Sequence, residues 1–259
     1  MTRLTTPTAS PWLNKVPEAT LFFWMIKMMS TTVGETAADY LNADLGFGLS
    51  ATTAVIGLLL AVTLFFQLRA RRYLPSLYWM VVVFISVFGT LVTDNLSDQL
   101  GVPLAVSTGV FTLALAATFA AWCACEKTLS IHTIDRPRRE WFYWTAILFT
   151  FALGTAAGDW VAEGLKLGYA YAGLLFGALI AVTALAYHAF AAPAVPCFWV
   201  AYVLTRPFGA ACGDLLSQPG ENGGLGLGTT GTSAVFLAVL VALVSYLSIM
   251  QQRAPAGKP

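Results

Sequence analysis

The chain has 259 residues, of which 58% are hydrophobic and only 10% are charged, and its formal net charge at pH 7 is +1. Its mean hydropathy is +0.72. A composition so apolar and so poor in charge excludes an ordinary soluble domain, and we expect an integral membrane protein embedded in the lipid bilayer.

Apolar segments long enough to cross a membrane follow one another along the chain. A helix needs about 20 residues to cross a hydrocarbon core about 30 Å thick. Eight segments have this length: residues 20–41, 49–68, 76–100, 103–125, 141–165, 169–190, 196–218 and 230–250. The sequence therefore predicts an all-α membrane domain over residues 20–250, between a tail at 1–19 and a tail at 251–259.

Lys and Arg residues gather in the segments that an eight-helix count places on one side of the membrane. These segments are the two tails and the connections after the second and fourth helices, which contain, for example, Lys15, Arg71, Arg138 and Arg253. The opposite loops contain one basic residue, Lys166. Because positive charge near helix ends stays in the cytoplasm, both termini are expected to be cytoplasmic. We interpret the basic connections as determinants of this orientation and not as nucleic-acid sites.

Acidic residues recur near the ends of the odd-numbered predicted helices. The first three copies are pairs of acids four residues apart, and the fourth copy has Gln in the second place: Glu35 with Asp39, Asp94 with Asp98, Asp159 with Glu163, and Asp214 with Gln218. Small residues stand one and five places before most of the first acids, as Gly158 and Gly154 do in the third copy. This register divides the membrane domain into four tandem two-helix units, at about 20–70, 76–126, 141–191 and 196–250.

The arrangement of the units follows from their length. Since each unit crosses the membrane twice, all of them enter it in the same direction. The sequence therefore predicts parallel helical hairpins related by pseudo-symmetry about the membrane normal. Small residues four apart lie on one stripe of a helix and allow backbones to approach closely. We expect the odd-numbered helices to pack tightly and to bring their acids together.

Three of the units share a Trp fifteen places before the first acid: Trp79, Trp144 and Trp199. Together with the acidic motifs, these residues resemble a family of bacterial membrane proteins known as a repeat of unknown function, with four tandem copies of two membrane helices and a characteristic Trp. The resemblance covers nearly the whole chain, although the first unit has Thr20 at the Trp position. It implies this architecture and a location in the bacterial inner membrane. Because the Trp residues lie near the expected cytoplasmic interface, we interpret them as membrane anchors.

The repeated carboxylates form a candidate metal site. Carboxylates with hydroxyl groups nearby, and without a Cys or His cluster, are a hard oxygen environment that suits Mg²⁺, Ca²⁺ or Mn²⁺. Threonine stands four places before the first acid in three units and extends this set of oxygen ligands: Thr31, Thr90 and Thr155. The acids lie at helix C-termini, whose partial negative charge disfavours them unless a cation or a proton compensates.

Basic residues are scarce within the predicted spans. Lys27 and Arg206 both stand eight places before the first acid of their units, which corresponds to about 12 Å of helix rise. Neither is therefore expected to pair with its own motif, but the two are neighbours if the units close into a ring. We regard them as candidate internal counter-ions for the carboxylates, some of which must be protonated or bound to a cation.

The leading hypothesis is a transporter for a hard divalent cation, Mn²⁺, Mg²⁺ or Ca²⁺, with proton exchange where the cation displaces protons. The first acids would form an inner ligand layer, and the second acids with Gln218 an outer layer. Two other classes stay open: a carrier for a small organic cation that uses aromatics such as Trp160 and Tyr40, and a structural or sensory membrane protein whose acids bond between repeats. No catalytic constellation or nucleotide-binding loop is visible, so no enzyme activity is expected. An oligomer is compatible with the sequence.

Overall fold

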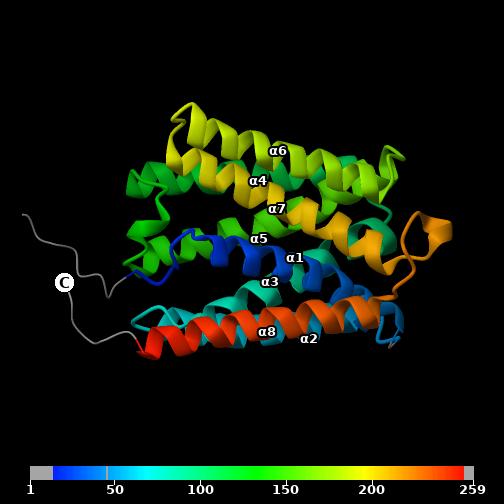
Figure 1. The fold of residues 1–259 in the computed structure, drawn as a ribbon, viewed down its shortest axis with the longest axis horizontal. Coiled ribbons are helices and arrows are strands. Elements are labelled where there is room, and N and C mark those ends of the chain that lie inside the picture. Colours follow the sequence, from blue (N-terminus) through cyan, green and yellow to red (C-terminus); the bar gives the residue numbers. More distant parts are fainter. Residues whose placement is uncertain (1–13, 45, 254–259) are drawn as a thin grey trace, which may run out of the picture.

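The computed structural model describes residues 14–44 and 46–253, and within them the chain forms eight α-helices and no β-strand. The helices are α1 (Leu21–Asp39), α2 (Leu49–Arg69), α3 (Pro75–Asp94), α4 (Leu104–Glu126), α5 (Pro137–Asp159), α6 (Tyr169–Ala189), α7 (Ala194–Ser217) and α8 (Thr229–Arg253). Figure 1 shows all of them running along the long axis of the molecule. The eight predicted helices are confirmed, while the parts of the predicted tails at 1–13 and 254–259 lie outside the described residues.

Six of the described helices are long and apolar enough to cross a membrane: α2, α3, α4, α5, α6 and α8. The expectation of eight such spans is therefore met by six. The two remaining helices, α1 and α7, carry the fully buried basic residues Lys27 and Arg206. Several long apolar helices in one chain are typical of a membrane protein.

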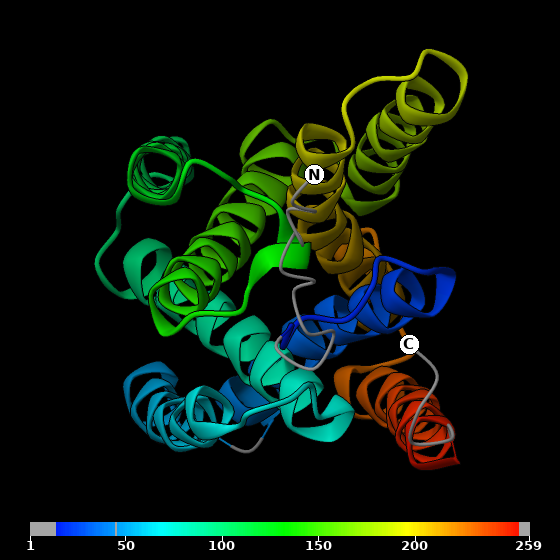
Figure 2. The same ribbon diagram turned by 90° about the vertical axis from the view of Figure 1, so that its left-hand side faces the viewer.

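The odd-numbered helices form an inner ring. Helix α1 packs against α3 and α7, and α5 packs against the same two helices, so the four contacts close on themselves. Each even-numbered helix lies outside the ring. Its main partner is the next odd-numbered helix in the chain: α2 packs on α3, α4 on α5, and α6 on α7. The last helix, α8, packs on the first, α1. Figure 2, which looks along the helices, shows the inner ring surrounded by the outer helices. Packing therefore links each two-helix unit of the sequence to the next.

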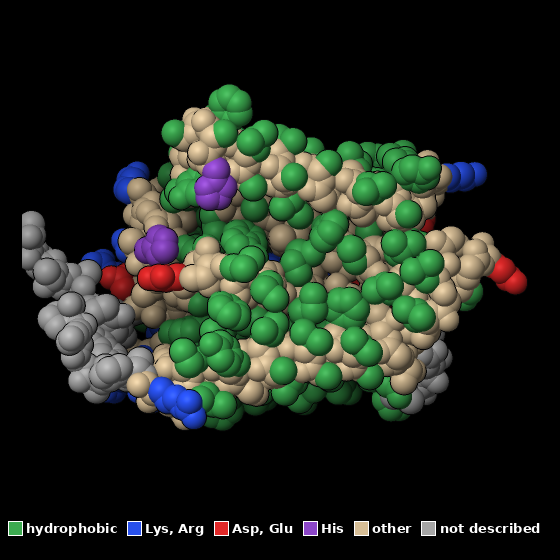
Figure 3. Space-filling model, in the orientation of Figure 1, with side chains coloured by type: hydrophobic (Ala, Val, Ile, Leu, Met, Phe, Trp, Pro, Cys, Tyr) green, Lys and Arg blue, Asp and Glu red, His purple; other side chains and the backbone are tan. Residues whose placement is uncertain are grey.

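Burial separates the inner helices from the outer ones. In the apolar stretches of α3 and α5, 61% of the residues are buried inside the protein, against 11–22% in the outer helices. The exposed surface of the outer helices is rich in large apolar side chains such as Leu58, Leu113 and Leu174, and Figure 3 shows such side chains over most of one face. An exposed apolar surface of this kind is typical of helices that face lipid or another protein, and the inner ring forms the core.

Small residues allow the inner helices to approach closely, as the sequence predicts. A Cβ atom added to Gly34 on α1 would overlap the side chain of Ser86 on α3, and one added to Gly154 on α5 would overlap Arg206 on α7. A Cβ on Gly209 of α7 would likewise overlap Thr31 of α1. The prediction of a small-residue packing stripe is therefore confirmed at these contacts.

The inner helices do not all end in the same way. Three of them continue into a five-residue π-helical segment: Tyr40–Asp44 after α1, Asn95–Gln99 after α3, and Trp160–Gly164 after α5. Helix α7 instead ends at Ser217, and Gln218 has an extended backbone. These π-helical segments were not predicted from the sequence, and such segments are frequent at functional sites.

Candidate functional site

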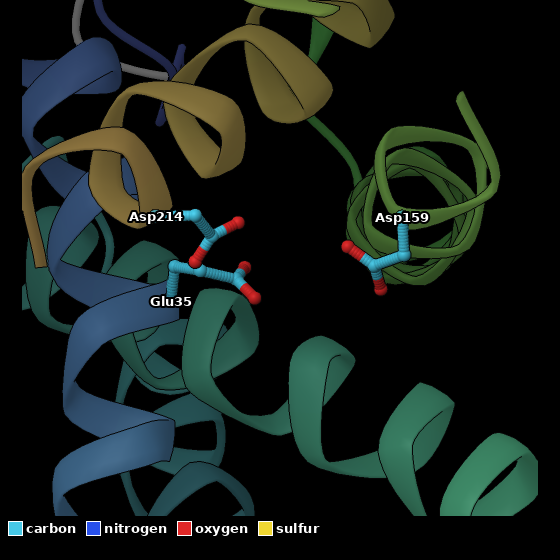
Figure 4. A group of neighbouring side chains, drawn as sticks. All are labelled: Glu35, Asp159 and Asp214. Carbon is cyan, nitrogen blue, oxygen red and sulfur yellow. The ribbon is translucent and has the colours of Figure 1, made fainter. Parts of the chain in front are cut away.

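Three of the predicted acids meet at the end of the inner ring. Glu35 of α1, Asp159 of α5 and Asp214 of α7 each place one carboxylate oxygen within 4.8 Å of the others. Glu35 is only 5% exposed and Asp214 only 7%, while Asp159 is half-buried. Figure 4 shows Asp159 directed toward Glu35 and Asp214 from the opposite side of the group. We call these three residues the carboxylate cluster.

The other first-position acid and two of the second-position residues are half-buried around this group. Asp94 at the end of α3 does not join the carboxylate cluster, and Asp39 and Gln218 are likewise half-buried at the ends of α1 and α7. The backbone carbonyl of Gln218 accepts a hydrogen bond of 2.9 Å from Gly226. The structure therefore brings together the first-position acids of three units and places that of the α3 unit outside the cluster.

Asp98 and Glu163 are exposed and bond within their own units. Ser97 Oγ donates a hydrogen bond of 2.8 Å to Asp98, and Tyr169 Oη donates one of 2.8 Å to Glu163. Both acids lie in π-helical segments beyond the ends of the inner helices. They do not contribute to the carboxylate cluster.

A guanidinium and a threonine hydroxyl link the carboxylate cluster to the rest of the inner ring; the hydroxyl is that of Thr90 on α3, which donates to Oε2 of Glu35 at 3.3 Å. Arg206 of α7 is fully buried, and its Nη2 lies 2.6 Å from Oε2 of Glu35. The same nitrogen donates hydrogen bonds to the hydroxyls of Thr90 and Thr155, the second at 2.7 Å. Because Arg206 pairs with an acid of another unit, the prediction that it does not pair with its own motif is confirmed.

The predicted threonine ligands serve this guanidinium in the described structure. The hydroxyls of Thr90 and Thr155 accept from Arg206, and the backbone carbonyl of Thr31 accepts from Nη1 of Arg206 at 3.3 Å. The hydroxyl of Thr31 donates instead to the carbonyl of Met28 at 2.7 Å. The cation that these threonines bind is therefore the guanidinium of Arg206, which is part of the protein itself.

Lys27 lies beside Arg206 but has different surroundings. Its ammonium is fully buried, 4.0 Å from the ring centre of Phe151 and 4.4 Å from that of Tyr202. It makes no hydrogen bond to any residue that the structure describes, and contact with aromatic faces is its visible stabilisation. The guanidinium carbon of Arg206 lies 5.7 Å from the same Phe151 ring. The prediction that Lys27 and Arg206 are neighbours is confirmed, but Lys27 forms no ion pair with a described carboxylate.

Aromatic side chains fill the inner ring toward the end where its helices begin. Tyr78 and Trp79 of α3, Tyr143 and Trp144 of α5, and Tyr202 of α7 are all buried; we call them the aromatic layer. The hydroxyls of Tyr78 and Tyr143 hydrogen bond to each other. The interpretation of the Trp residues as membrane anchors is therefore wrong, because Trp79, Trp144 and Trp199 are all buried inside the protein.

Phe151 is a residue that the sequence analysis missed. It stands eight places before Asp159, the same register position as Lys27 and Arg206 in their units, and it lies beneath both cations. An alignment of this position across the units would have identified it. An apolar residue in an apolar helix has no distinguishing signature in a single sequence.

The carboxylate cluster has the chemistry of a cation site. Ionised carboxylates at this separation repel one another, so the arrangement requires positive charge or shared protons. Arg206 supplies one positive charge, through Glu35. The remaining oxygens of Asp159 and Asp214 are hard ligands that suit Mg²⁺, Ca²⁺ or Mn²⁺.

Comparison with known families gives four tandem matches that together span most of the chain. The matches are to the Repeat of Unknown Function (DUF347), at residues 22–73, 77–128, 142–192 and 197–253. Each matched segment contains one inner and one outer helix. Comparisons with curated proteins and with solved structures gave no match. The chain belongs to the DUF347 repeat family.

Proposed function

We propose that the protein transports a hard divalent cation, Mn²⁺, Mg²⁺ or Ca²⁺, across the membrane. The observation that carries this proposal is the carboxylate cluster, in which oxygens from three inner helices lie within 4.8 Å of one another. Acids inside a membrane protein are costly and mark ion or proton pathways. We therefore assign to this site the binding and movement of a cation, and we propose no chemical reaction there.

The charge of the cluster supports a divalent ion. Glu35 is paired with Arg206, so the two Asp carboxylates remain to be balanced when all groups are ionised. One divalent ion supplies that balance, as do two protons. Exchange of a metal for protons is therefore the form of coupling that the site favours.

We also propose how the four units are arranged and how the protein is oriented in the membrane. The four family matches and the closed ring of inner helices support four parallel units related by pseudo-symmetry about the membrane normal. Basic residues near the beginnings of the inner helices, such as Lys15 and Arg138, support cytoplasmic termini, and the bacterial inner membrane is the location that we propose. In this orientation the carboxylate cluster lies toward the outer side, and the exposed Asp98 and Glu163 lie at its approach.

The test is metal binding and metal flux with the full chain reconstituted in proteoliposomes. Asp159→Asn and Asp214→Asn each remove one charged ligand, and each is expected to weaken Mn²⁺ binding at least about tenfold and to abolish Mn²⁺ flux. Glu18→Gln is the control, because Glu18 is an exposed acid that precedes α1 and lies outside the cluster, and it should leave both quantities within about twofold of wild type.

Three outcomes would contradict the proposal. Unchanged flux in Asp159→Asn and Asp214→Asn would remove the cluster from the transport path. Absence of Mn²⁺, Mg²⁺ and Ca²⁺ binding by the wild-type protein, with binding of a small organic ammonium ion, would move the site to the organic-cation class. Binding of neither would favour a structural or sensory role.

A further inference from the structure

Arg206 and the proposed metal compete for the same carboxylate. Nη2 of Arg206 lies 2.6 Å from Oε2 of Glu35, and Glu35 is one of the three residues of the carboxylate cluster. The guanidinium is therefore a positive charge that is permanently attached to the protein and lies beside the proposed metal ligands. No other described Lys or Arg forms an ion pair with the cluster.

The position of the guanidinium is fixed by contacts with three inner helices besides its own. It is bonded to Glu35 and to the carbonyl of Thr31 on α1, to Thr90 on α3 and to Thr155 on α5. Arginine stays protonated in proteins, and its planar fork holds several acceptors at once. A charge held in this way is a permanent component of the site's electrostatics.

We infer that Arg206 determines which cation charge the site accepts, by cancelling one of its three carboxylates. The inference rests on the proposed function. With Glu35 neutralised by Arg206, the ionised cluster has a net charge of minus two, which matches one divalent ion. Without Arg206 the same ligands would have a net charge of minus three and would favour a trivalent ion more strongly, because electrostatic attraction scales with the product of the charges.

Lys27 provides a matched control. It occupies the same register position in its unit as Arg206, and it is also fully buried and near Phe151. It differs in having no hydrogen bond or ion pair to a carboxylate of the cluster among the described residues. Replacing it therefore tests whether the loss of any buried basic side chain in this layer would have the same effect.

The experiment measures binding of Mn²⁺ and of the hard trivalent probe Tb³⁺ to the purified full chain in detergent, by calorimetry and by Tb³⁺ luminescence. The quantity compared is the ratio of the two affinities. Arg206→Gln is expected to shift this ratio toward Tb³⁺ by about tenfold or more. Arg206→Lys keeps the charge and should stay closer to wild type, and Lys27→Met should leave the ratio within about twofold.

Two further variants keep the inference testable where Arg206→Gln does not fold, since removing one partner of a buried ion pair is costly. Glu35→Gln changes the net charge of the cluster from minus two to minus one and should shift the ratio toward Mn²⁺ by about tenfold. The double variant Glu35→Gln with Arg206→Gln restores a net charge of minus two and should return the ratio to that of wild type.

The outcomes separate this inference from the proposed function. If wild type binds Mn²⁺ and the ratio does not follow net charge across these variants, Arg206 does not set the selectivity, while the metal site stands. If the ratio shifts equally in Lys27→Met, the effect belongs to the whole buried layer, and the assignment to Arg206 is overturned. If wild type binds neither ion, the proposed function and the inference both fail.

Discussion

The same four inner helices build two halves of opposite chemistry. The half that contains the aromatic layer is stabilised by ring packing, with Tyr78 and Trp79 in edge-to-face contact at 5.1 Å between ring centres. The half that contains the carboxylate cluster buries charges, which are stable only when each has a partner. Both halves are buried, so burial alone does not distinguish a site from a core.

The two halves differ in the kind of contact that neighbouring helices make with one another. In the aromatic half, neighbouring helices meet mainly through apolar faces and one hydroxyl pair. In the acidic half, they meet through Arg206, whose contacts reach α1, α3 and α5. Phe151 lies between these halves, beneath both Lys27 and Arg206. A substitution of Phe151 should therefore affect both halves.

The largest effect is expected for Phe151→Ala. Truncation of a fully buried Phe leaves a cavity, and the free energy of unfolding should fall by about 3 to 5 kcal/mol, with some further loss because Lys27 and Arg206 lose an aromatic face. Unfolding in mixed micelles with increasing SDS measures this quantity. The matched control is Phe66→Ala on α2, where the side chain is 56% exposed and its removal should cost little. Equal losses in the two variants would show that the boundary has no special role.

A smaller effect is expected for Gly154→Ala. The added Cβ overlaps Cβ and Cγ of Arg206 and lies 3.0 Å from Cδ of Pro207, and such overpacking costs about 1 to 3 kcal/mol. Because it pushes Arg206 away from its acceptors, Mn²⁺ affinity should change as well as stability. Gly109→Ala on α4 is the control, since a Cβ there meets nothing within 4 Å. Unfolding in SDS measures the stability, and Mn²⁺ titrations measure the affinity. A loss of stability with unchanged Mn²⁺ affinity would show that helix packing at Gly154 does not affect the site.

The sequence predicted the helices and the close packing of the inner ring well, because both depend on local patterns. A run of about 20 apolar residues determines a span, and small residues four apart determine a contact stripe. The register of Glu35, Asp159 and Asp214 was visible for the same reason. The repeat also predicted that the first and last units meet if the ring closes, and α7 does pack against α1; the individual bonds between these helices were not visible in the sequence.

The parts that could not be predicted depend on contacts between distant segments or on backbone hydrogen bonding. The bond from Arg206 to Glu35 joins residues 171 apart in sequence. The exposure of Asp98 and Glu163 is associated with π-helical segments, which no recognised residue pattern signals. The burial of Trp79 was missed because a Trp near a helix start has the same sequence signature in a core as in an aromatic belt.

The smallest effect is expected in the aromatic half, at the hydroxyl pair of Tyr78 and Tyr143. Tyr78→Phe leaves the buried hydroxyl of Tyr143 without this partner and should lower the free energy of unfolding by about 1 kcal/mol. The double change of both Tyr to Phe removes donor and acceptor together and should cost less than the sum of the single changes, as a double-mutant cycle in mixed micelles would measure. Mn²⁺ affinity should be unchanged in all three variants, because the aromatic layer contributes no ligand to the carboxylate cluster. A loss of Mn²⁺ binding with stability intact would instead make the aromatic half part of the ion path.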